Sequence, residues 1–254
     1  MSEEHFTPQM SVHYLLSQRG LTVEDLDLAP TVVVTWGAAM CRALAEEIGA
    51  REPACWLYPG RYPCYVGQVD GQRVSILLAP VGAPGTVMLM EELIACGART
   101  FIGLGWAGSL QTTAPVGALL LPTGCIREEG TSFHYLDADA ELAPAGPLAE
   151  RLLASGRAEG AAPLAGPLWT TDAPYRELQS QVVQYRQQGV LGVDMETSAM
   201  YALGQYRGVA VCNLLVVSDE LWGEWRPAFG AAELEQANGL ARRVVVNCLA
   251  GWVY

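Results

Sequence analysis

The sequence predicts a single α/β domain with a central mixed, mostly parallel β-sheet flanked by helices. Runs rich in β-branched residues alternate with helix-forming segments along all 254 residues. No stretch has the composition of a linker. Hydrophobic residues make up 51% of the chain and charged residues 17%, so one large core is expected. We therefore interpret residues 1–254 as one domain, with residues 1–30 as an N-terminal arm.

In the first half of the chain, strand and helix patterns follow one another closely. The sequence Asp70-Gly71 between two alternating runs is a strong β-hairpin signal. The expected elements are, in order, a short arm helix before Gly20, a strand over 31–36, a helix over 38–50, strands over 64–69 and 73–78, a helix from about 87 to 97 and a strand over 100–104.

The second half continues this alternation. We expect the helix near 147–154 to be peripheral and the C-terminal helix to pack on the outside of the domain. The expected elements are a strand over 118–126, a polar loop containing His134, a helix near 147–154, a strand over 168–171, a helix over 177–188, a helix over 195–207, a buried parallel strand over 209–217 and an amphipathic helix over 231–253.

One glycine motif, Gly103, Gly105 and Gly108, has the G-x-G-x-x-G spacing of dinucleotide-binding folds. Such a site requires a helix to open at the motif, so that its N-terminus faces a pyrophosphate. Here Pro115 and Gly117 follow, and then a β-like run. A nicotinamide dinucleotide site is therefore not expected.

The best candidates for chemistry are three acids in residues 192–220: Asp194, Glu196 and Asp219. Glu196 is expected in a first helical turn, where the helix dipole favours an ionised carboxylate that accepts hydrogen bonds from ligand hydroxyls. Asp219 follows the carboxyl end of a buried strand, where open α/β sheets bind ligands and where partial desolvation suits a carboxyl to donating a proton. For all three acids, helix capping is the alternative role.

Composition excludes several classes of partner. The formal charge of −12 argues against nucleic acids and anionic membranes. All 15 basic residues are Arg, so Schiff-base chemistry on Lys and a phosphate-loop Lys are excluded. Seven scattered cysteines suit a reducing cytoplasm, three dispersed His predict no metal site, and no apolar run reaches membrane-spanning length.

The motifs VDMETSAMYAL, VVSDEL, TTDAPYRE and LPTGCIREEGTSFHYL, with a G-x-P and EEL between Gly82 and Leu93, make the chain similar to the nucleoside phosphorylase family. This family holds purine nucleoside phosphorylases, uridine phosphorylases and related nucleosidases. The resemblance covers nearly the whole chain in the same order. It implies the fold predicted above and cleavage of the N-glycosidic bond of a nucleoside.

The resemblance also implies roles for individual residues. Met195 and Glu196 match the pair that packs under the ribose and binds its 2′- and 3′-hydroxyls, with Asp194 as a second acid near the sugar and base. Asp219, supported by Ser218, matches the acid that protonates or hydrogen-bonds N7 of a purine leaving group.

The resemblance implies roles for three further positions. Trp169 falls where the family places an aromatic side chain against the base. His5 and Arg61 fall roughly where family members lend a ribose 5′-hydroxyl ligand and a phosphate ligand to a neighbouring subunit. A homo-oligomer, from dimer to hexamer, with shared sites is implied. The Gln and Arg typical of uracil recognition have no evident counterparts around residues 165–176, which favours purines.

The phosphate site departs from the family pattern. The usual Gly-Asp-Pro turn with a following Arg reads GAAMCR at residues 37–42, and Gly103 and Trp106 replace an Arg and a hydroxyl. Losing one bidentate Arg contact costs roughly 1.5 to 3 kcal/mol. The remaining phosphate candidates are Gly37, Arg42, Arg61 and backbone N–H groups near Gly82 and Gly108.

These residues predict phosphorolysis of a nucleoside, with a purine favoured, to free base and ribose 1-phosphate. Phosphate is the expected co-substrate, and no cofactor is expected. One alternative is hydrolysis by water, although the Glu that the nucleosidase branch places after the first strand is replaced by Gly37, Ala38 and Ala39. The other alternative is a non-catalytic nucleoside-binding homologue.

Overall fold

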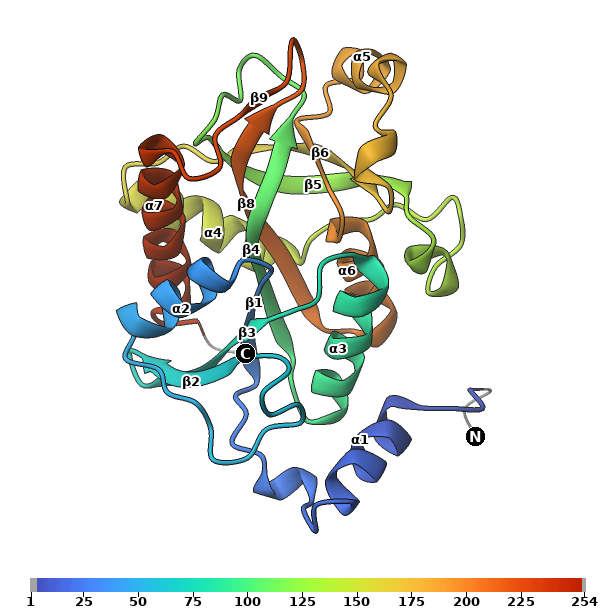
Figure 1. Cartoon of the computed structure of the whole chain (residues 1–254), viewed down its shortest axis with the longest axis vertical. Helices are drawn as coiled ribbons and strands as arrows, with labels where there is room; N and C mark the ends of the chain where they lie inside the picture. The colour runs from blue at the N-terminus through green and yellow to red at the C-terminus, as the bar shows by residue number, and fades with distance from the viewer. Residues whose placement is uncertain (1–3, 253–254) are drawn as a thin grey trace.

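A computed structural model describes residues 4–252, which form one α/β domain around a nine-stranded sheet (Figure 1). The strand order is β2-β3-β1-β4-β7-β6-β5-β8-β9. The strands are β1 (Thr31–Thr35), β2 (Cys64–Val69), β3 (Gln72–Leu78), β4 (Thr100–Ser109), β5 (Leu119–Glu128), β6 (Leu164–Thr171), β7 (Gly192–Asp194), β8 (Ala210–Glu220) and β9 (Arg226–Pro227).

Strand β4 is the centre of this sheet, because it pairs in parallel with both β1 and β8 and, near its end, in antiparallel with β7. Strand β8 also pairs with β5, and β5, β6 and β7 pair in succession. The strands β4, β7, β6, β5 and β8 therefore close into a ring, from which β1, β3 and β2 extend. The mixed, mostly parallel sheet is as predicted, whereas its closure into a ring was not predicted.

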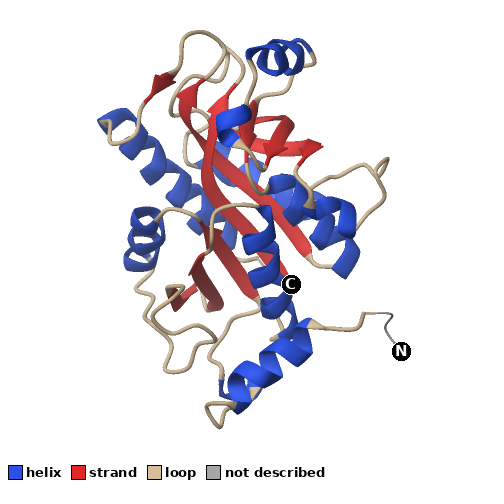
Figure 2. Ribbon diagram, turned by 45° about the vertical axis from the view of Figure 1, so that its right-hand side comes forward, coloured by secondary structure: helices blue, strands red, loops and turns tan. Residues whose placement is uncertain are grey.

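Helices cover the sheet in two groups, which the turned view separates (Figure 2). One hydrophobic cluster joins the sheet to α2, α4 and α7, and a second joins it to α1, α3 and α6. The helices are α1 (Pro8–Ser17), α2 (Ala38–Glu47), α3 (Ala83–Ala95), α4 (Gly146–Ala158), α5 (Gln179–Gln187), α6 (Thr197–Arg207) and α7 (Ala232–Leu249), with 3₁₀ turns η1 (Val23–Asp25), η2 (Thr131–His134) and η3 (Pro174–Arg176).

Local sequence signals act as predicted at two turns. Asp70 and Gly71 both have positive φ, 47° and 78°, as a tight hairpin between β2 and β3 requires. Gly208 ends α6 in the left-handed conformation with φ 66°. These positions explain why β2, β3 and α6 begin and end close to the expected residues.

Other expectations about the elements need correction. Helix α4 is not peripheral, because Leu148 and Leu152 are fully buried in the core. Helix α7 buries one face, including Val244 and Val245, as an amphipathic helix on the outside does, but it ends at Leu249. Val253, the predicted end, lies outside the described residues. The short strands β7 and β9 were not predicted.

The glycine motif lies within β4, which runs on through Gly103, Gly105 and Gly108 to Ser109 without opening a helix. This agrees with the expectation that no dinucleotide site forms there. None of the helices in residues 4–252 combines the length and hydropathy that crossing a membrane requires. Within the same residues, no group of three or more His, Cys, Asp or Glu side chains is arranged to hold a metal ion.

Candidate active site

A cavity of about 730 Å³ opens at the carboxyl ends of β1, β4 and β8. This is the edge where open α/β sheets bind ligands. Its volume lies within the usual range for ligand pockets. The lining residues are Trp36, Gly37, Met40, Val81, Leu104, Gly105, Trp106, Ala107, Gly108, Pro174, Tyr175, Glu177, Val193, Asp194, Met195, Glu196, Ser218, Asp219, Leu221, Trp225 and Phe229.

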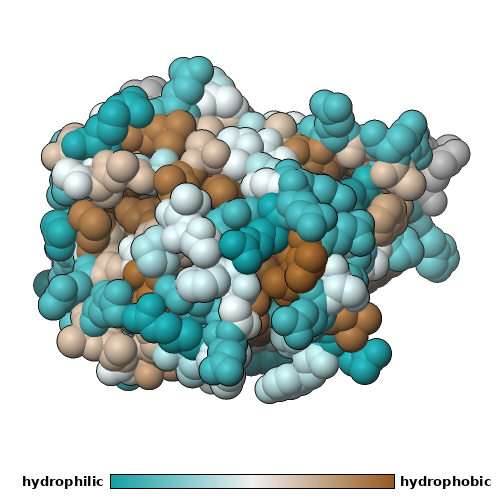
Figure 3. Space-filling model, turned by 90° about the horizontal axis from the view of Figure 1, so that it is seen from above, coloured by the Kyte–Doolittle hydropathy of each residue, from teal (hydrophilic) through white to brown (hydrophobic). Residues whose placement is uncertain are grey.

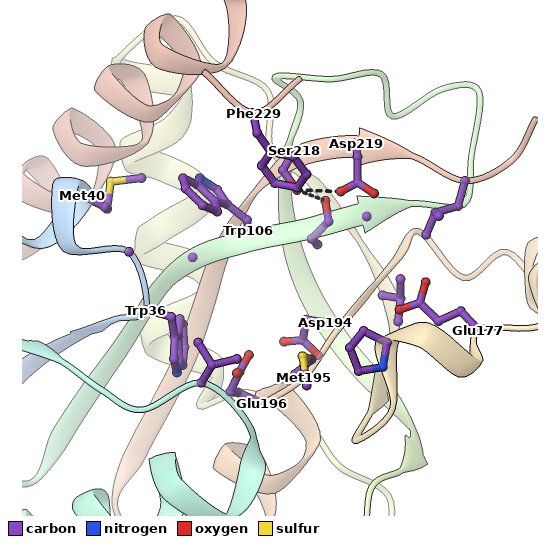
Figure 4. A pocket seen from close by; sticks show the side chains of 18 of the residues that line it. Trp36, Met40, Trp106, Glu177, Asp194, Met195, Glu196, Ser218, Asp219 and Phe229 are labelled. Carbon is purple, nitrogen blue, oxygen red and sulfur yellow. Dashed lines mark hydrogen bonds between the residues drawn. The ribbon is translucent and has the colours of Figure 1, made fainter. Parts of the chain in front are cut away.

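Asp194 and Glu196 form one wall of this cavity, where β7 turns into α6 (Figure 4). Asp194 Oδ1 accepts a hydrogen bond of 2.7 Å from Thr170 Oγ1, and Asp194 Oδ2 accepts one of 3.0 Å from the N–H of Thr197. Thr197 Oγ1 also donates to Oδ2. Asp194 therefore caps α6, as its alternative role predicts, and also lines the cavity.

Glu196 is the N-cap residue of α6, and its Oε1 accepts a hydrogen bond of 2.6 Å from the N–H of Gly82, which precedes α3. Burial, and after it the charge of Asp194, raises the pKa of Glu196; the Gly82 N–H acts in the opposite direction. Burial likewise raises the pKa of Asp194. The helix dipole was expected to favour an ionised Glu196, and desolvation and the like charge of Asp194 act against it.

Asp219 lies opposite these acids, near the end of β8. Ser218 Oγ donates a hydrogen bond of 2.7 Å to Oδ1, and Trp225 Nε1 donates one of 2.8 Å to Oδ2. A register shift between Ala107 and Gly108, where β4 pairs with β8, occurs beside this acid. Each oxygen of Asp219 thus already accepts one hydrogen bond from the protein.

Aromatic and aliphatic side chains form the other end of the cavity. Trp36 Nε1 donates to Thr86 Oγ1 at 2.8 Å, and Trp106 Nε1 donates to Asn238 Oδ1 at 2.9 Å. The Trp106 ring packs against Phe229, with 6.1 Å between ring centroids. Both indoles are therefore held in place. In Figure 4, Trp36 lies beside Glu196, and Trp106 lies on the side of Phe229.

The rim of the cavity also exposes apolar side chains. Trp225 and Phe229, on either side of β9, are 62% and 57% exposed. Seen from above, the surface of the molecule mixes hydrophobic patches with hydrophilic ones (Figure 3). A ligand at this end meets an amphipathic opening rather than a strongly charged one.

Four carboxylates and no Arg or His are among the described residues that line the cavity. Two of the phosphate candidates, Arg42 and Arg61, are exposed and do not line it, and Arg61 stacks over the ring of Tyr62 instead. The N–H of Gly82 is occupied by Glu196. Gly37 and Gly108 do line the cavity, but they bring no positive charge.

Gly103 cannot be replaced by a larger residue without rearrangement, because a Cβ atom there would overlap the side-chain amide of Asn213. Asn213 Nδ2 in turn donates to Thr197 Oγ1 at 2.8 Å, which ties β8 to the start of α6. The family's Arg at this position, implied by the resemblance, is therefore excluded by the packing of this chain.

Trp169 does not line the cavity, contrary to the role implied for it. It is 1% exposed and packs against Tyr185 of α5, with ring centroids 5.1 Å apart. Pro174, Tyr175 and Glu177, five to eight residues further along, line the cavity instead. Their only signal in the sequence is the motif TTDAPYRE, and none of the three was predicted as a site residue.

The remaining predicted residues also fall into two groups, those that line the cavity and those that do not. Met195, Ser218 and Trp106 line the cavity together with the three acids. His5 is exposed on the arm and lies outside the cavity, as expected of a residue lent to a neighbouring subunit. That sharing of residues stays a prediction.

Comparison with known proteins agrees with this geometry. Residues 37–250 match the family model described as "Phosphorylase superfamily", and the chain belongs to this family. A guanosine phosphorylase of Halorubrum lacusprofundi is 28% identical over 148 residues, which are 57% of this chain and 61% of that relative. A uridine phosphorylase of Haemophilus influenzae is 23% identical over 197 residues, 72% of this chain and 77% of that relative.

A solved structure shares the fold. The crystal structure of the purine nucleoside phosphorylase of Toxoplasma gondii in complex with immucillin-H superposes with a TM-score of 0.82, at 24% sequence identity. The superposition covers 91% of this chain and 93% of that one. The ring of strands and its flanking helices are therefore the architecture of a nucleoside phosphorylase fold.

Proposed function

We propose that the protein cleaves the N-glycosidic bond of a nucleoside. The observation that carries this proposal is that Glu196 and Asp219, from different elements, face one cavity at the carboxyl edge of the sheet. Breaking this bond builds positive charge on the sugar and negative charge on the base. Glu196, with Met195, binds the ribose hydroxyls, and Asp219, with Ser218, handles the departing base.

The raised pKa of Glu196 suits this role. Positive charge developing on the sugar draws the carboxyl toward its ionised form, so the attraction is stronger in the transition state than with bound substrate. An interaction of this kind raises kcat rather than only lowering KM.

We infer phosphorolysis as the first candidate reaction, with ribose 1-phosphate and a free base, preferably a purine, as products. Relatives named as guanosine and uridine phosphorylases support phosphate as the co-substrate. The lack of evident counterparts of uracil-recognising residues around 165–176 supports a purine as the base. Since no cation lines the cavity among residues 4–252, phosphate binding calls for Arg61 from a second copy in a homo-oligomer. Seven free thiols suit a cytoplasmic enzyme.

Hydrolysis of the same bond is the second candidate, and a specific observation favours it. A phosphate dianion beside four carboxylates and three tryptophans is repelled and poorly hydrogen-bonded, whereas water is neutral. Hydrolysis predicts free ribose as the product.

The test is to incubate purified protein with inosine, guanosine, adenosine and uridine, with and without inorganic phosphate, and to measure base, ribose and ribose 1-phosphate. Phosphate-dependent formation of ribose 1-phosphate supports phosphorolysis, and free ribose at a rate indifferent to phosphate supports hydrolysis. Thermal stabilisation by nucleosides with no turnover under any condition would contradict both and support a binding protein.

A further inference from the structure

Glu177 is a cavity acid to which neither the sequence nor the proposed function gives a role. It follows η3 and precedes α5, and its side chain reaches the cavity from that segment (Figure 4). It is half-buried, and no hydrogen bond or ion pair within residues 4–252 involves its carboxyl group. A partly desolvated carboxyl without a protein partner is free to interact with a ligand.

The charged groups around Glu177 are mostly acids. Asp219 on β8 faces it, and Asp194 and Glu196 form the opposite wall of the same cavity. On its own segment, Arg176 is exposed and does not line the cavity. Burial, and then the charge of Asp219, raises the pKa of Glu177 to about 7. Glu177 therefore gains and loses its proton near neutral pH.

Asp219 differs from Glu177 in its contacts. Both oxygens of Asp219 accept hydrogen bonds, from Ser218 and from Trp225. Both oxygens of Asp219 are therefore occupied as acceptors, whereas the Glu177 carboxyl has no partner in the described part of the chain. Of these two facing acids, Asp219 is held as a hydrogen-bond acceptor and Glu177 is free. The pair can therefore divide the tasks of accepting a hydrogen bond and donating a proton.

We propose that Glu177 is the catalytic proton donor to the leaving base, and that Asp219 is the acceptor that holds the base beside it. This rests on the proposed function. As the C–N bond breaks, its electron pair goes to the base, and the proton of the Glu177 carboxyl moves to a ring nitrogen. The anomeric carbon forms its new bond to the oxygen of phosphate or water. Glu177 leaves the step as a carboxylate and regains a proton from solvent.

The first experiment compares the pH dependence of kcat/KM in wild type and Glu177→Gln, using inosine and a nitrophenyl riboside. The wild type should lose activity toward inosine as pH rises through about 7, because the donor is then deprotonated. Glu177→Gln should lose about 10²-fold or more with inosine and lack this alkaline limb. With nitrophenyl riboside, whose leaving group needs no proton, the two proteins should differ by less than about threefold.

Asp172→Asn is the matched control. Asp172 is a carboxylate on the same segment, but it lies outside the cavity and accepts a hydrogen bond of 2.9 Å from the N–H of Gly130. Its pH profile should match that of wild type. An alkaline limb that persists in Glu177→Gln, or equal losses with both substrates, would overturn the donor assignment.

The second experiment does not depend on turnover. Calorimetric titration with free hypoxanthine at pH 8, in buffers of different ionisation enthalpy, counts the protons taken up on binding. Wild type and Asp172→Asn should take up a proton, and Glu177→Gln should not. Proton uptake without any turnover would sink the proposed function while keeping Glu177 as the group that protonates on base binding. Equal uptake in all three proteins would sink the Glu177 assignment alone.

Discussion

Single residues in the cavity combine structural and chemical tasks. Asp194 caps α6 through Thr197 and also lines the cavity, so its removal would disturb both the helix and the site. Glu196 contacts the backbone of Gly82 and is otherwise placed to meet a ligand. The two acids therefore call for different substitutions if function is to be separated from folding.

Glu196→Gln should abolish most activity while the protein remains folded. The amide keeps the shape of the side chain but loses the negative charge. That charge strengthens the hydrogen bonds from two ribose hydroxyls and attracts the positive charge that develops on the sugar. Two charge-assisted hydrogen bonds at about 1.5 to 3 kcal/mol each correspond to a fall in kcat/KM of about 10²- to 10⁴-fold. Steady-state kinetics with the preferred nucleoside checks this, and circular dichroism checks the fold. A loss below about fivefold would remove Glu196 from the ribose site.

Trp169 shows which property of single residues the sequence alone does not determine, namely which side chain of a strand faces the cavity. The motif TTDAPYRE located the right segment, yet the choice between Trp169 and the residues after Asp172 depends on which face of β6 meets the cavity. Trp169 pairs in register with Val193, and its ring packs toward Tyr185 of α5. Such a choice is made by tertiary packing, which leaves no local pattern in the sequence.

Among the elements, β4 explains why a dinucleotide-like motif occurs without a dinucleotide site. A Cβ atom at Gly105 would lie 2.6 Å from the Trp36 ring, and one at Gly108 would lie 2.7 Å from Leu221. The glycines therefore allow neighbouring side chains to pack directly on the strand backbone. The motif has the spacing of a dinucleotide-binding turn, but in this chain its glycines serve close packing.

Gly105→Ala should destabilise the fold by about 1 to 3 kcal/mol, because Trp36 must shift to make room. Gly124→Ala in β5 is the control, since its nearest atom would be the carbonyl oxygen of Leu142 at 3.7 Å, an ordinary contact. Urea unfolding of both variants measures the free energies of unfolding. Equal stability of the two variants would show that Trp36 is not held against β4.

Element order was predictable because periodicity and turn residues act locally. Asp70-Gly71 and Gly208 ended their elements where expected. Pairing of β4 with β8 and the three-residue strand β7 were not predictable, because both depend on contacts between segments far apart in the sequence. The acids of residues 192–220 and Trp106 were predicted from local motifs. Trp36, Trp225, Phe229 and Glu177 were not, because they reach the cavity only through tertiary packing.

For the whole molecule, the main electrostatic feature is a cluster of carboxyls around the cavity at the carboxyl edge of the sheet. Burial raises the pKa values of Asp194, Glu196 and Glu177, the last to about 7. The folded state then binds protons more tightly than the unfolded chain. Stability from these groups is fully present below their ordinary pKa values and is lost as pH rises through the raised ones.

The free energy of unfolding should therefore fall between about pH 5 and pH 8, and Glu196→Gln should reduce this fall. Since the net charge of −12 adds repulsion in the same direction, Glu235→Gln on the exposed face of α7 serves as a control of equal charge change. Urea unfolding across this pH range gives the slopes. If both variants changed the slope equally, general repulsion rather than the buried acids would set it.

The walls of the cavity have one more practical consequence. Three of the seven tryptophans, Trp36, Trp106 and Trp225, line it, and they come from three separate parts of the chain. An aromatic ligand that stacks on these indoles should quench their fluorescence. The protein thus carries an intrinsic optical probe, with which occupancy can be followed without a label, including for compounds that it holds but never converts.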